Sequence, residues 1–252
     1  MKKDIKNNLK KDNNETENKN KKDKENNKIK SIFKDFDYDN IKLDKKYLIQ
    51  LFWIFFLACF IGVVLETFFC YFQRGYFESR TALILEPLNP IYGVGAVLFT
   101  VLVIPIYKKG SLAVFVSSMF IGGIFEYVCS FMQEMIFGTI SWQYGKDVLG
   151  ILDRTSFIYC IFWGILGILW VKFIYPLFIN LFNKVDGKVL RIITYILIVI
   201  VSFDCIFSAL ATNRYNQRHE NVPAQNFLDN FFDKYFNDEK MKKIYPNMTF
   251  VN

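Results

Sequence analysis

Five long apolar stretches, separated by short polar segments, dominate the chain between residues 47 and 212. Each contains at most one charged residue, and none alternates strictly between apolar and polar positions. Each is long enough to cross a hydrocarbon core of about 30 Å, which takes roughly 20 helical residues. Backbone groups in lipid must be bonded within the protein, so such runs favour helices over barrel strands. The pattern predicts an all-α polytopic membrane protein with transmembrane helices at 47–72, 88–107, 111–133, 155–182 and 192–212.

The polar segments at the two ends differ in pattern. Residues 1–28 are a low-complexity run of Lys, Asn, Asp and Glu, and we expect this tail to be disordered. Residues 29–46 place apolar side chains at helical spacing between lysines, which is typical either of an amphipathic juxtamembrane helix or of a chance apolar cluster. The C-terminal tail, 213–252, contains an apolar helical face behind Pro223, suited to an interfacial, docking or purely structural helix: Phe227, Leu228, Phe231, Phe232, Tyr235 and Phe236.

Charge is segregated along the chain. Residues 1–46 hold 15 Lys against 10 Asp or Glu, so this segment accounts for most of the net charge of +7. The basic balance is therefore no sign of nucleic-acid binding. The short turns around 108–110 and 183–191 are more basic than the opposite turns, which favours a cytoplasmic N-terminus and an external C-terminal tail. We expect the protein in a bacterial plasma membrane, with the lipid bilayer as its first partner.

Enzyme chemistry has little support in the sequence. The five cysteines all fall within the apolar stretches and match no metal-ligand spacing, and the lone His219 lies in the polar C-terminal segment. No nucleophile elbow and no phosphate-binding GxxxxGK motif is present. We therefore predict no enzyme activity, no metal and no cofactor, and any ATP that drives this protein would bind to a separate subunit.

An internal repeat relates the first apolar stretch to the third. Phe60-Ile61-Gly62 followed by Glu66 recurs 60 residues later as Phe120-Ile121-Gly122 followed by Glu126. The stretches that follow also resemble one another, since each begins with glycines and ends near a proline. We infer two parallel two-helix repeats with the fifth helix added. Glycines permit close helix packing in lipid, and we assign that role to Gly62, Gly93, Gly95, Gly122, Gly164 and Gly167.

Charged residues at membrane depth provide the candidate site. Glu66, Glu126 and Asp204 lie well along helices that enter from the cytoplasmic side, which puts them in the outer half of the membrane. An ionisable group there normally faces a bundle interior or a watery cavity and has a partner. One interpretation is an outer-facing polar cavity for substrate or ions; the other is a network that only sets helix register. The residues are Glu66, Glu126, Arg154, Asp204, Arg80 and Asp153, with Arg154 as the expected partner of the glutamates.

Several ordered motifs resemble the type IV ABC-transporter permease family of bacteria, the CmpB-type integral membrane proteins. They are Gly62-Val63-Val64-Leu65-Glu66-Thr67, Pro87-x-x-Pro90-Ile91-Tyr92-Gly93-Val94-Gly95-Ala96, Glu126-Tyr127, Trp142-x-Tyr144, and Arg154 with Trp163-Gly164-Ile165-Leu166-Gly167. The resemblance covers roughly 51–204. It departs from the family at Val63, where a tryptophan is usual, and at Glu86, where a glycine is usual. The resemblance implies a permease subunit.

Two functions remain open at this level. A permease subunit needs cytoplasmic surfaces for a separate ATP-binding subunit, yet the turns at 108–110 and 183–188 are very short for coupling helices. A non-transporting membrane scaffold, or a signalling or envelope protein, would bind partners through its helices and tails and would not need such surfaces. The substrate, the energy source and the oligomeric state, a homo-oligomer included, are left undecided by the sequence.

Overall fold

The computed structural model describes residue 38 and residues 44–144, 150–151, 153–185 and 187–251. Within this part, five helices are long and apolar enough to cross a membrane, which confirms the all-α polytopic fold. The tail expected over 1–28, and nearly all of the segment expected over 29–46, lie outside the described residues. The five spans are Lys45–Arg74, Pro90–Lys109, Ser111–Phe137, Phe157–Val185 and Lys188–His219.

The first and third spans are unbroken α-helices that end in the same way. Helix α2 (Lys45–Arg74) begins after Asp44, whose carboxylate accepts a hydrogen bond from the amide of Tyr47. It ends at Gly75, and α4 (Ser111–Phe137) ends at Gly138, both in the left-handed conformation with φ of 81° and 61°. Glycine adopts this conformation without the steric penalty of a Cβ, so each glycine marks where the chain leaves the helix.

The second and fourth spans each change their winding at a π-turn. Helix α3 (Pro90–Leu98) continues through η2 (Phe99–Val103) into a 3₁₀ segment, η3 (Ile104–Lys109). Helix α5 (Phe157–Leu169) continues through η4 (Trp170–Ile174) into α6 (Tyr175–Val185). A proline, Pro105 or Pro176, follows each π-turn. Its ring would clash with the carbonyl four residues earlier, which lies inside the π-turn, so the wider winding accommodates it.

Matching close contacts hold each hairpin of helices together. A Cβ on Gly62 of α2 would overlap Tyr92 of α3, and a Cβ on Gly122 of α4 would overlap Trp163 of α5. Glycine lets the aromatic ring of the second helix lie directly on the backbone of the first. The two π-turns begin 71 residues apart, as do the two prolines. The two hairpins thus share their contacts and their irregularities, in agreement with the repeat in the sequence.

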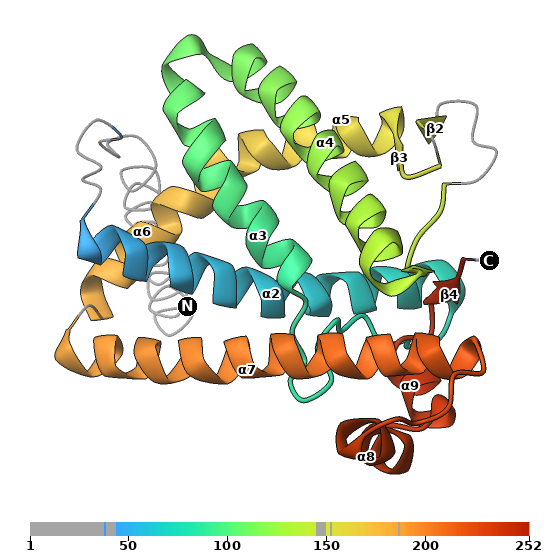
Figure 1. Ribbon diagram of the computed structural model, residues 1–252. Helices are drawn as coiled ribbons and strands as arrows, with labels where there is room; N and C mark the ends of the chain where they lie inside the picture. The colour runs from blue at the N-terminus through green and yellow to red at the C-terminus, as the bar shows by residue number, and fades with distance from the viewer. Residues whose placement is uncertain (1–37, 39–43, 145–149, 152, 186, 252) are drawn as a thin grey trace, which may run out of the picture.

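The helices are arranged as two hairpins beside a fifth helix. Helix α3 packs on α2, and α5 packs on α4. Helix α7 (Lys188–His219) lies beside α2 and runs in the same direction (Figure 1). The indole N–H of Trp53 in α2 donates to the hydroxyl of Thr194 in α7 at 2.9 Å, which links the two helices near their starts. The ends of α2, α4 and α7 therefore gather at one end of the bundle.

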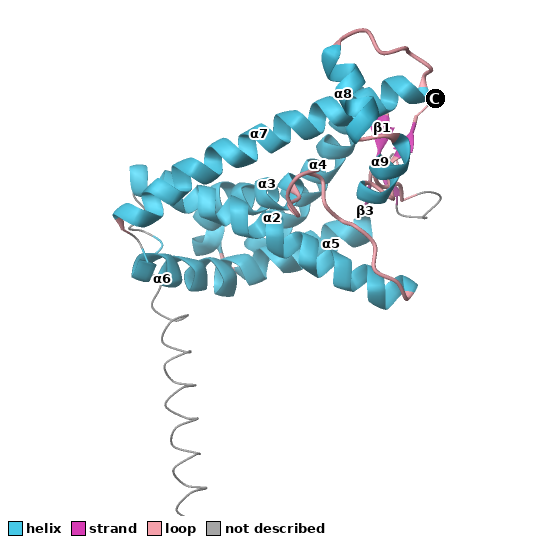
Figure 2. Ribbon diagram, turned by 90° about the horizontal axis from the view of Figure 1, so that it is seen from below, coloured by secondary structure: helices cyan, strands magenta, loops and turns pink. Residues whose placement is uncertain are grey.

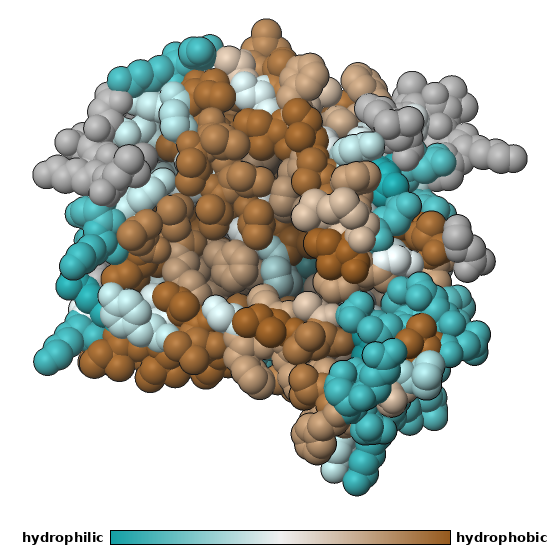
Figure 3. Space-filling view, viewed as in Figure 1, coloured by the Kyte–Doolittle hydropathy of each residue, from teal (hydrophilic) through white to brown (hydrophobic). Residues whose placement is uncertain are grey.

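Large apolar side chains cover the outside of the bundle. Leu112, Phe120 and Val199 are 76%, 66% and 68% exposed. Figure 3 shows a broad apolar surface between hydrophilic ends. An exposed apolar surface of this extent is far larger than that of a water-soluble protein, so the surroundings of these side chains are lipid.

The C-terminal segment folds against the bundle instead of extending from it. It forms α8 (Phe227–Tyr235), α9 (Asp238–Ile244) and β4 (Thr249–Phe250), at the end where α2, α4 and α7 finish (Figures 1 and 2). Strand β4 pairs antiparallel with β1 (Thr139–Ile140), which follows α4. Helix α8 occupies the segment whose apolar spacing predicts a helix. We call 222–251 the C-terminal cap.

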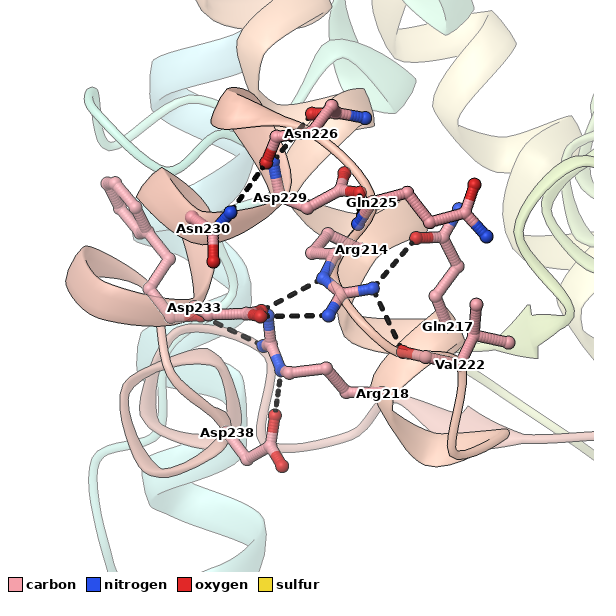
Figure 4. A network of polar contacts seen from close by, with 11 residues as sticks. Arg214, Gln217, Arg218, Val222, Gln225, Asn226, Asp229, Asn230, Asp233 and Asp238 are labelled. Atoms are coloured by element: carbon pink, nitrogen blue, oxygen red, sulfur yellow. Dashed lines mark hydrogen bonds and ion pairs between the residues drawn. The ribbon is translucent and has the colours of Figure 1, made fainter.

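An ion-pair network joins the cap to α7. The guanidinium of Arg214, which is 3% exposed, donates to both carboxylate oxygens of Asp233 at 2.9 and 2.8 Å (Figure 4). Arg218, one turn later in α7, also donates to Asp233, at 2.8 Å, and to Asp238, at 2.6 Å. The hydrogen bonds from Arg214 and Arg218 hold the pKa of Asp233 below its usual range. Two arginines of α7 thereby fix the position of α8 and the start of α9.

Candidate functional site

Glu126 of α4 accepts hydrogen bonds from three neutral donors. One carboxylate oxygen binds the hydroxyl of Tyr144. The other accepts from the hydroxyl of Thr155 at 2.8 Å and from the indole N–H of Trp163 at 3.4 Å. Trp163 is the residue whose ring lies on Gly122, one turn before Glu126. The packing contact of the second hairpin therefore also places a donor on the carboxylate.

The segment that joins α4 to α5 brings the other two donors to Glu126. Trp142 donates from its indole to the carbonyl of Arg154 at 3.1 Å, and the amide of Tyr144 donates to the carbonyl of Asp153 at 3.1 Å. Strand β2 (Gly150–Ile151) pairs with β3 (Thr155–Ser156) within the same segment. Asp153 has a φ of 59°, in the left-handed region, and its backbone carbonyl accepts the hydrogen bond from Tyr144. The segment folds back over the end of α4.

Tyr144 is near both repeat glutamates. Burial raises the pKa of its hydroxyl, the hydrogen bond to Glu126 raises it further, and the charge of Glu66 adds to the effect. Its ring also packs against that of Tyr159 in α5, with centroids 4.6 Å apart. The raised pKa favours the protonated hydroxyl, which is the form that donates to Glu126.

Arg154 is paired with a different acid from the one expected. Its guanidinium makes an ion pair with Glu134, two turns after Glu126 in α4, and donates to Ser130 at 3.3 Å. It also lies over the rings of Tyr127 and Phe131, at 5.9 and 5.6 Å from their centroids. The prediction that Arg154 is the partner of Glu126 is thus corrected. Ser130 and Glu134 occupy the same face of α4, and this face binds the arginine.

Glu66 of α2 belongs to a separate ion-pair group on the segment that follows α2. Arg80 lies 3.5 Å from Glu66 and 2.7 Å from Glu78, and Glu78 is also paired with Arg74 at 2.6 Å. Asn247 of the cap completes the group. With its carboxamide oxygen toward Arg80 and its nitrogen toward Glu78, these contacts are 2.7 and 3.3 Å. The expected pairing of Glu66 with Arg80 is therefore present.

Asp204 of α7 holds the backbone of the segment before α3. Its fully buried carboxylate accepts from the amide of Leu85 at 3.3 Å, from that of Glu86 at 3.1 Å and from the hydroxyl of Ser208 at 2.9 Å. Ser208 in turn accepts from the amide of Ile84 at 2.9 Å. Three consecutive amides are thus bound by two side chains of α7. Backbone donors of this kind stabilise a buried carboxylate without a cation.

Glu86 lies against this buried carboxylate. Burial raises the pKa of Glu86, and the charge of Asp204 raises it further. One of its carboxylate oxygens is buried without a hydrogen-bond partner among the described residues. An open hollow of about 380 Å³ adjoins Glu86 between this segment and α9, where Lys240 and Lys243 also line it. The raised pKa favours the protonated form of Glu86 beside Asp204.

The six glycines assigned to helix packing all lie against another helix. Gly93 meets Phe55 and Cys59 of α2, and Gly95 meets Phe125 of α4. On α5, Gly164 meets Phe115 and Met119, and Gly167 meets Ser118, all from α4. Close contact of this kind keeps α5 near Glu126, since Trp163 directly precedes Gly164.

The site differs chemically from its counterpart in the first repeat. Among the described residues Glu126 has neutral donors only, whereas Glu66 has an arginine. No group of three potential metal ligands occurs in the described part of the chain. An ionisable group at membrane depth normally has a partner, and the partners of Glu126 among the described residues are Tyr144, Thr155 and Trp163.

The model of the family described as "Putative ABC-transporter type IV" matches residues 53–209, more than half of the chain. The chain belongs to this ABC-transporter family. The resemblance seen in the sequence motifs is confirmed, and the match includes both repeat hairpins and most of α7. Neither the curated proteins nor the solved structures contain a significant match to the chain.

Sequence analysis of this ABC-transporter family member missed several partners at the site. Tyr144 appears in the family motifs but its contact with Glu126 is not implied by spacing. Glu134 follows Ser130 by four residues, and this helical spacing is a signal that could have identified the Arg154 site. Asn247 lies more than 160 residues from Arg80 and Glu78 in sequence, and no local pattern relates it to them.

Proposed function

We propose that this multi-pass membrane protein is the membrane-spanning subunit of an ABC-type transporter, with Glu126 at the centre of its ligand site. The observation that carries the proposal is a carboxylate within an apolar span whose described partners are all neutral donors. We propose that its counter-charge is a proton or a cationic group of the ligand. The family match supports the transporter class. The charge of Glu126 is our only ground for proposing a proton or a cationic substrate.

The surrounding residues suit the same role. Tyr144, Tyr159 and Trp163 supply aromatic rings around the carboxylate, and such rings attract a cation. Other polar groups would form the walls of the ligand site. They are the group of Glu66 and Arg80, the pair of Arg154 with Glu134, the buried Asp204 and the turn at Asp153. We propose that these groups face the outside of a bacterial plasma membrane and that the N-terminus is cytoplasmic, because the opposite turns carry the basic residues.

A scaffold or signalling role remains the second candidate, and one observation favours it. At the end opposite to the site, η3 and α4 are joined through Gly110 alone, and α7 begins only a few residues after α6 ends. These turns provide little surface for an ATP-binding subunit. A transporter would need surface from the N-terminal region in addition.

Co-purification separates the two candidates. The full chain, tagged at its C-terminus and extracted from its own host in mild detergent, would be analysed by mass spectrometry and assayed for ATP hydrolysis. A transporter subunit is expected to bring down a protein with a GxxxxGK motif in near-equal amount. Hydrolysis by the complex should disappear when the lysine of that motif is replaced. Recovery of the chain with no such subunit and no hydrolysis would favour the scaffold.

The role of Glu126 is tested in the same complex. Glu126→Gln keeps the size of the side chain and removes the charge, so the complex should assemble normally but respond differently to ligand or to external pH in its rate of ATP hydrolysis. Glu239→Gln is the matched control, since Glu239 pairs only with Lys243 on the exposed surface of α9. Identical responses in the wild type and in both variants would show that Glu126 has no role in the transport mechanism.

A further inference from the structure

Helix α8 has two adjoining apolar faces, and only one of them is covered. Phe232 and Phe236 are 2% and 8% exposed, because both pack on Phe207 of α7. Phe227 and Leu228 at the start of the helix are 81% and 49% exposed. Tyr235, two turns later on the same side, is 50% exposed. The uncovered face is too large and too aromatic to be accounted for by the internal packing of the cap.

The depth of the contact on α7 places α8 at the edge of the membrane. Phe207 lies five residues before Thr212, where the apolar stretch of α7 ends. At 1.5 Å per residue, Phe207 is about 8 Å inside that end. Helix α8 lies on the side of α7 that faces away from the other spans, in both views of the molecule (Figures 1 and 2). Lipid is expected on that side.

The exposed face of α8 is continuous with the lipid-facing surface of α7. Phe203 of α7 is 58% exposed and stacks on Phe207, with ring centroids 5.6 Å apart. Phe207 contacts Phe231 at 6.1 Å, and Phe231 contacts Tyr235 at 4.9 Å. An unbroken series of aromatic rings therefore runs from the middle of a transmembrane helix to the far end of α8.

The acidic and amide side chains of α8 lie away from this face. Asp233 points to Arg214 and Arg218 of α7, and Asp229 accepts from the amide of Gln225 (Figure 4). Asn230 is exposed on the remaining side. Lys234 lies at the edge of the aromatic face, with its ammonium 5.1 Å from the ring centroid of Tyr235. A helix with an aromatic face, a polar face and no long apolar core is typical of an interfacial helix, which buries its apolar face about 5–10 Å into the boundary between headgroups and acyl chains.

We propose that α8 is a membrane-interface helix, and that Phe227, Leu228, Phe231 and Tyr235 insert into the lipid leaflet in which α7 ends. The occupant of the exposed face is the bilayer that α7 itself crosses. The arginine network holds the polar side of α8 while the aromatic side enters lipid. The cap is thereby fixed to the membrane surface at two places, by α7 and by α8. This inference holds whichever side of the membrane the cap is on, and it does not depend on the transport function.

Spin labels on opposite faces of α8 test the proposal. Single cysteines at 227 and 228, and a matched control at 230, would be labelled in a cysteine-free chain in nanodiscs of phosphatidylethanolamine and phosphatidylglycerol. Collision with oxygen, which concentrates in lipid, is compared with collision with a water-soluble nickel chelate. We expect oxygen to dominate at 227 and 228 by several-fold relative to 230, where the nickel chelate dominates.

Two results would overturn the proposal. Equal exposure to the nickel chelate at 227, 228 and 230 would place both faces of α8 in water. Protection of 227 and 228 from both reagents would show that protein, such as a second copy of the chain, covers the face. If the cysteine-free chain does not fold, the wild-type chain in nanodiscs that contain a photoactivatable diazirine lipid provides the second measurement. Cross-links to 227–235 are then expected, and their absence beside cross-links to the exposed face of α7 counts against insertion.

Discussion

At the scale of single residues, the two repeat glutamates have the same place in sequence and different surroundings. Glu126 accepts from Tyr144, Thr155 and Trp163, whereas Glu66, with a side chain 32% exposed, has an ion pair of 3.5 Å. Removal of Glu126 leaves one buried donor, Thr155, and two partly buried donors without this acceptor. The loss costs up to roughly 1–3 kcal/mol for each donor that finds no other partner. Removal of a partly exposed ion pair costs at most about 1 kcal/mol.

We therefore expect Glu126→Ala to lower the thermal unfolding temperature in detergent clearly more than Glu66→Ala does. The two variants control for one another, since both delete a carboxylate from an apolar helix at equivalent repeat positions. Trp163→Phe, which removes one of the three donors, should reduce the difference between them. Equal losses in the two glutamate variants would show that the three hydrogen bonds contribute nothing specific.

Glu86 makes stability depend on pH in a definite direction. Burial and the charge of Asp204 raise the pKa of Glu86 in the folded protein, so the folded state binds a proton more tightly than the unfolded chain does. Stability from this group is present below the unfolded pKa, near 4.5, and is lost as the pH rises through the raised pKa. Glu86→Gln, which mimics the protonated form, should flatten this decline. Unfolding temperatures of the two proteins between pH 4 and 8 measure the difference, and parallel profiles would contradict the prediction.

At the scale of elements, the contact between α7 and α8 depends on Asp233. Asp233→Asn removes the charge that Arg214 and Arg218 share, and it leaves Arg214 buried without its acid. We expect a loss of about 1–3 kcal/mol, less than for a fully buried pair because the side chain of Asp233 is 30% exposed. Hydrogen exchange in 227–244 should increase in this variant, while exchange in the middle of α4 should not change.

Asp233 makes stability depend on pH in the direction opposite to that of Glu86. Its folded pKa is lowered by Arg214 and Arg218, so its contribution is present above the unfolded pKa, near 3.8, and is lost as the pH falls through the lowered pKa. The cap should therefore loosen only in strong acid. Glu239→Gln is a suitable control, because its pair with Lys243 is exposed and is expected to contribute nothing measurable. Unchanged exchange in Asp233→Asn would mean that aromatic packing on Phe207 alone holds α8.

At the scale of the whole molecule, the direction of the bundle in the membrane is a prediction from the basic turns. Lys188 lies at the start of α7 and Lys240 lies in α9, at opposite ends of the structure (Figure 1). Both side chains are exposed. In a cysteine-free chain in intact cells, an impermeant thiol reagent is expected to label Lys240→Cys and to leave Lys188→Cys unlabelled until the cells are broken. The reverse pattern would show that the cap is cytoplasmic.

The sequence by itself determined the number of spans, the helical class, the family and the repeat of the two hairpins. Lipid offers no partners to backbone groups, so a long apolar run must be a helix whatever surrounds it. The packing role of the glycines could also be predicted, because close packing in lipid needs small residues at regular positions. These features depend on local composition and spacing, so they do not depend on how distant segments of the chain pack.

Only the tertiary structure decided the partner of each charged side chain. Arg154 binds Glu134 and not Glu126, Asp204 binds the amides of a distant segment, and Asn247 of the cap reaches Arg80. Ion pairs and hydrogen bonds require contact within about 3–4 Å, and residues far apart in sequence reach that distance only through the packing of whole helices. The same reason applies to α8, since its apolar spacing was visible in the sequence while its position on the outer side of α7 was not.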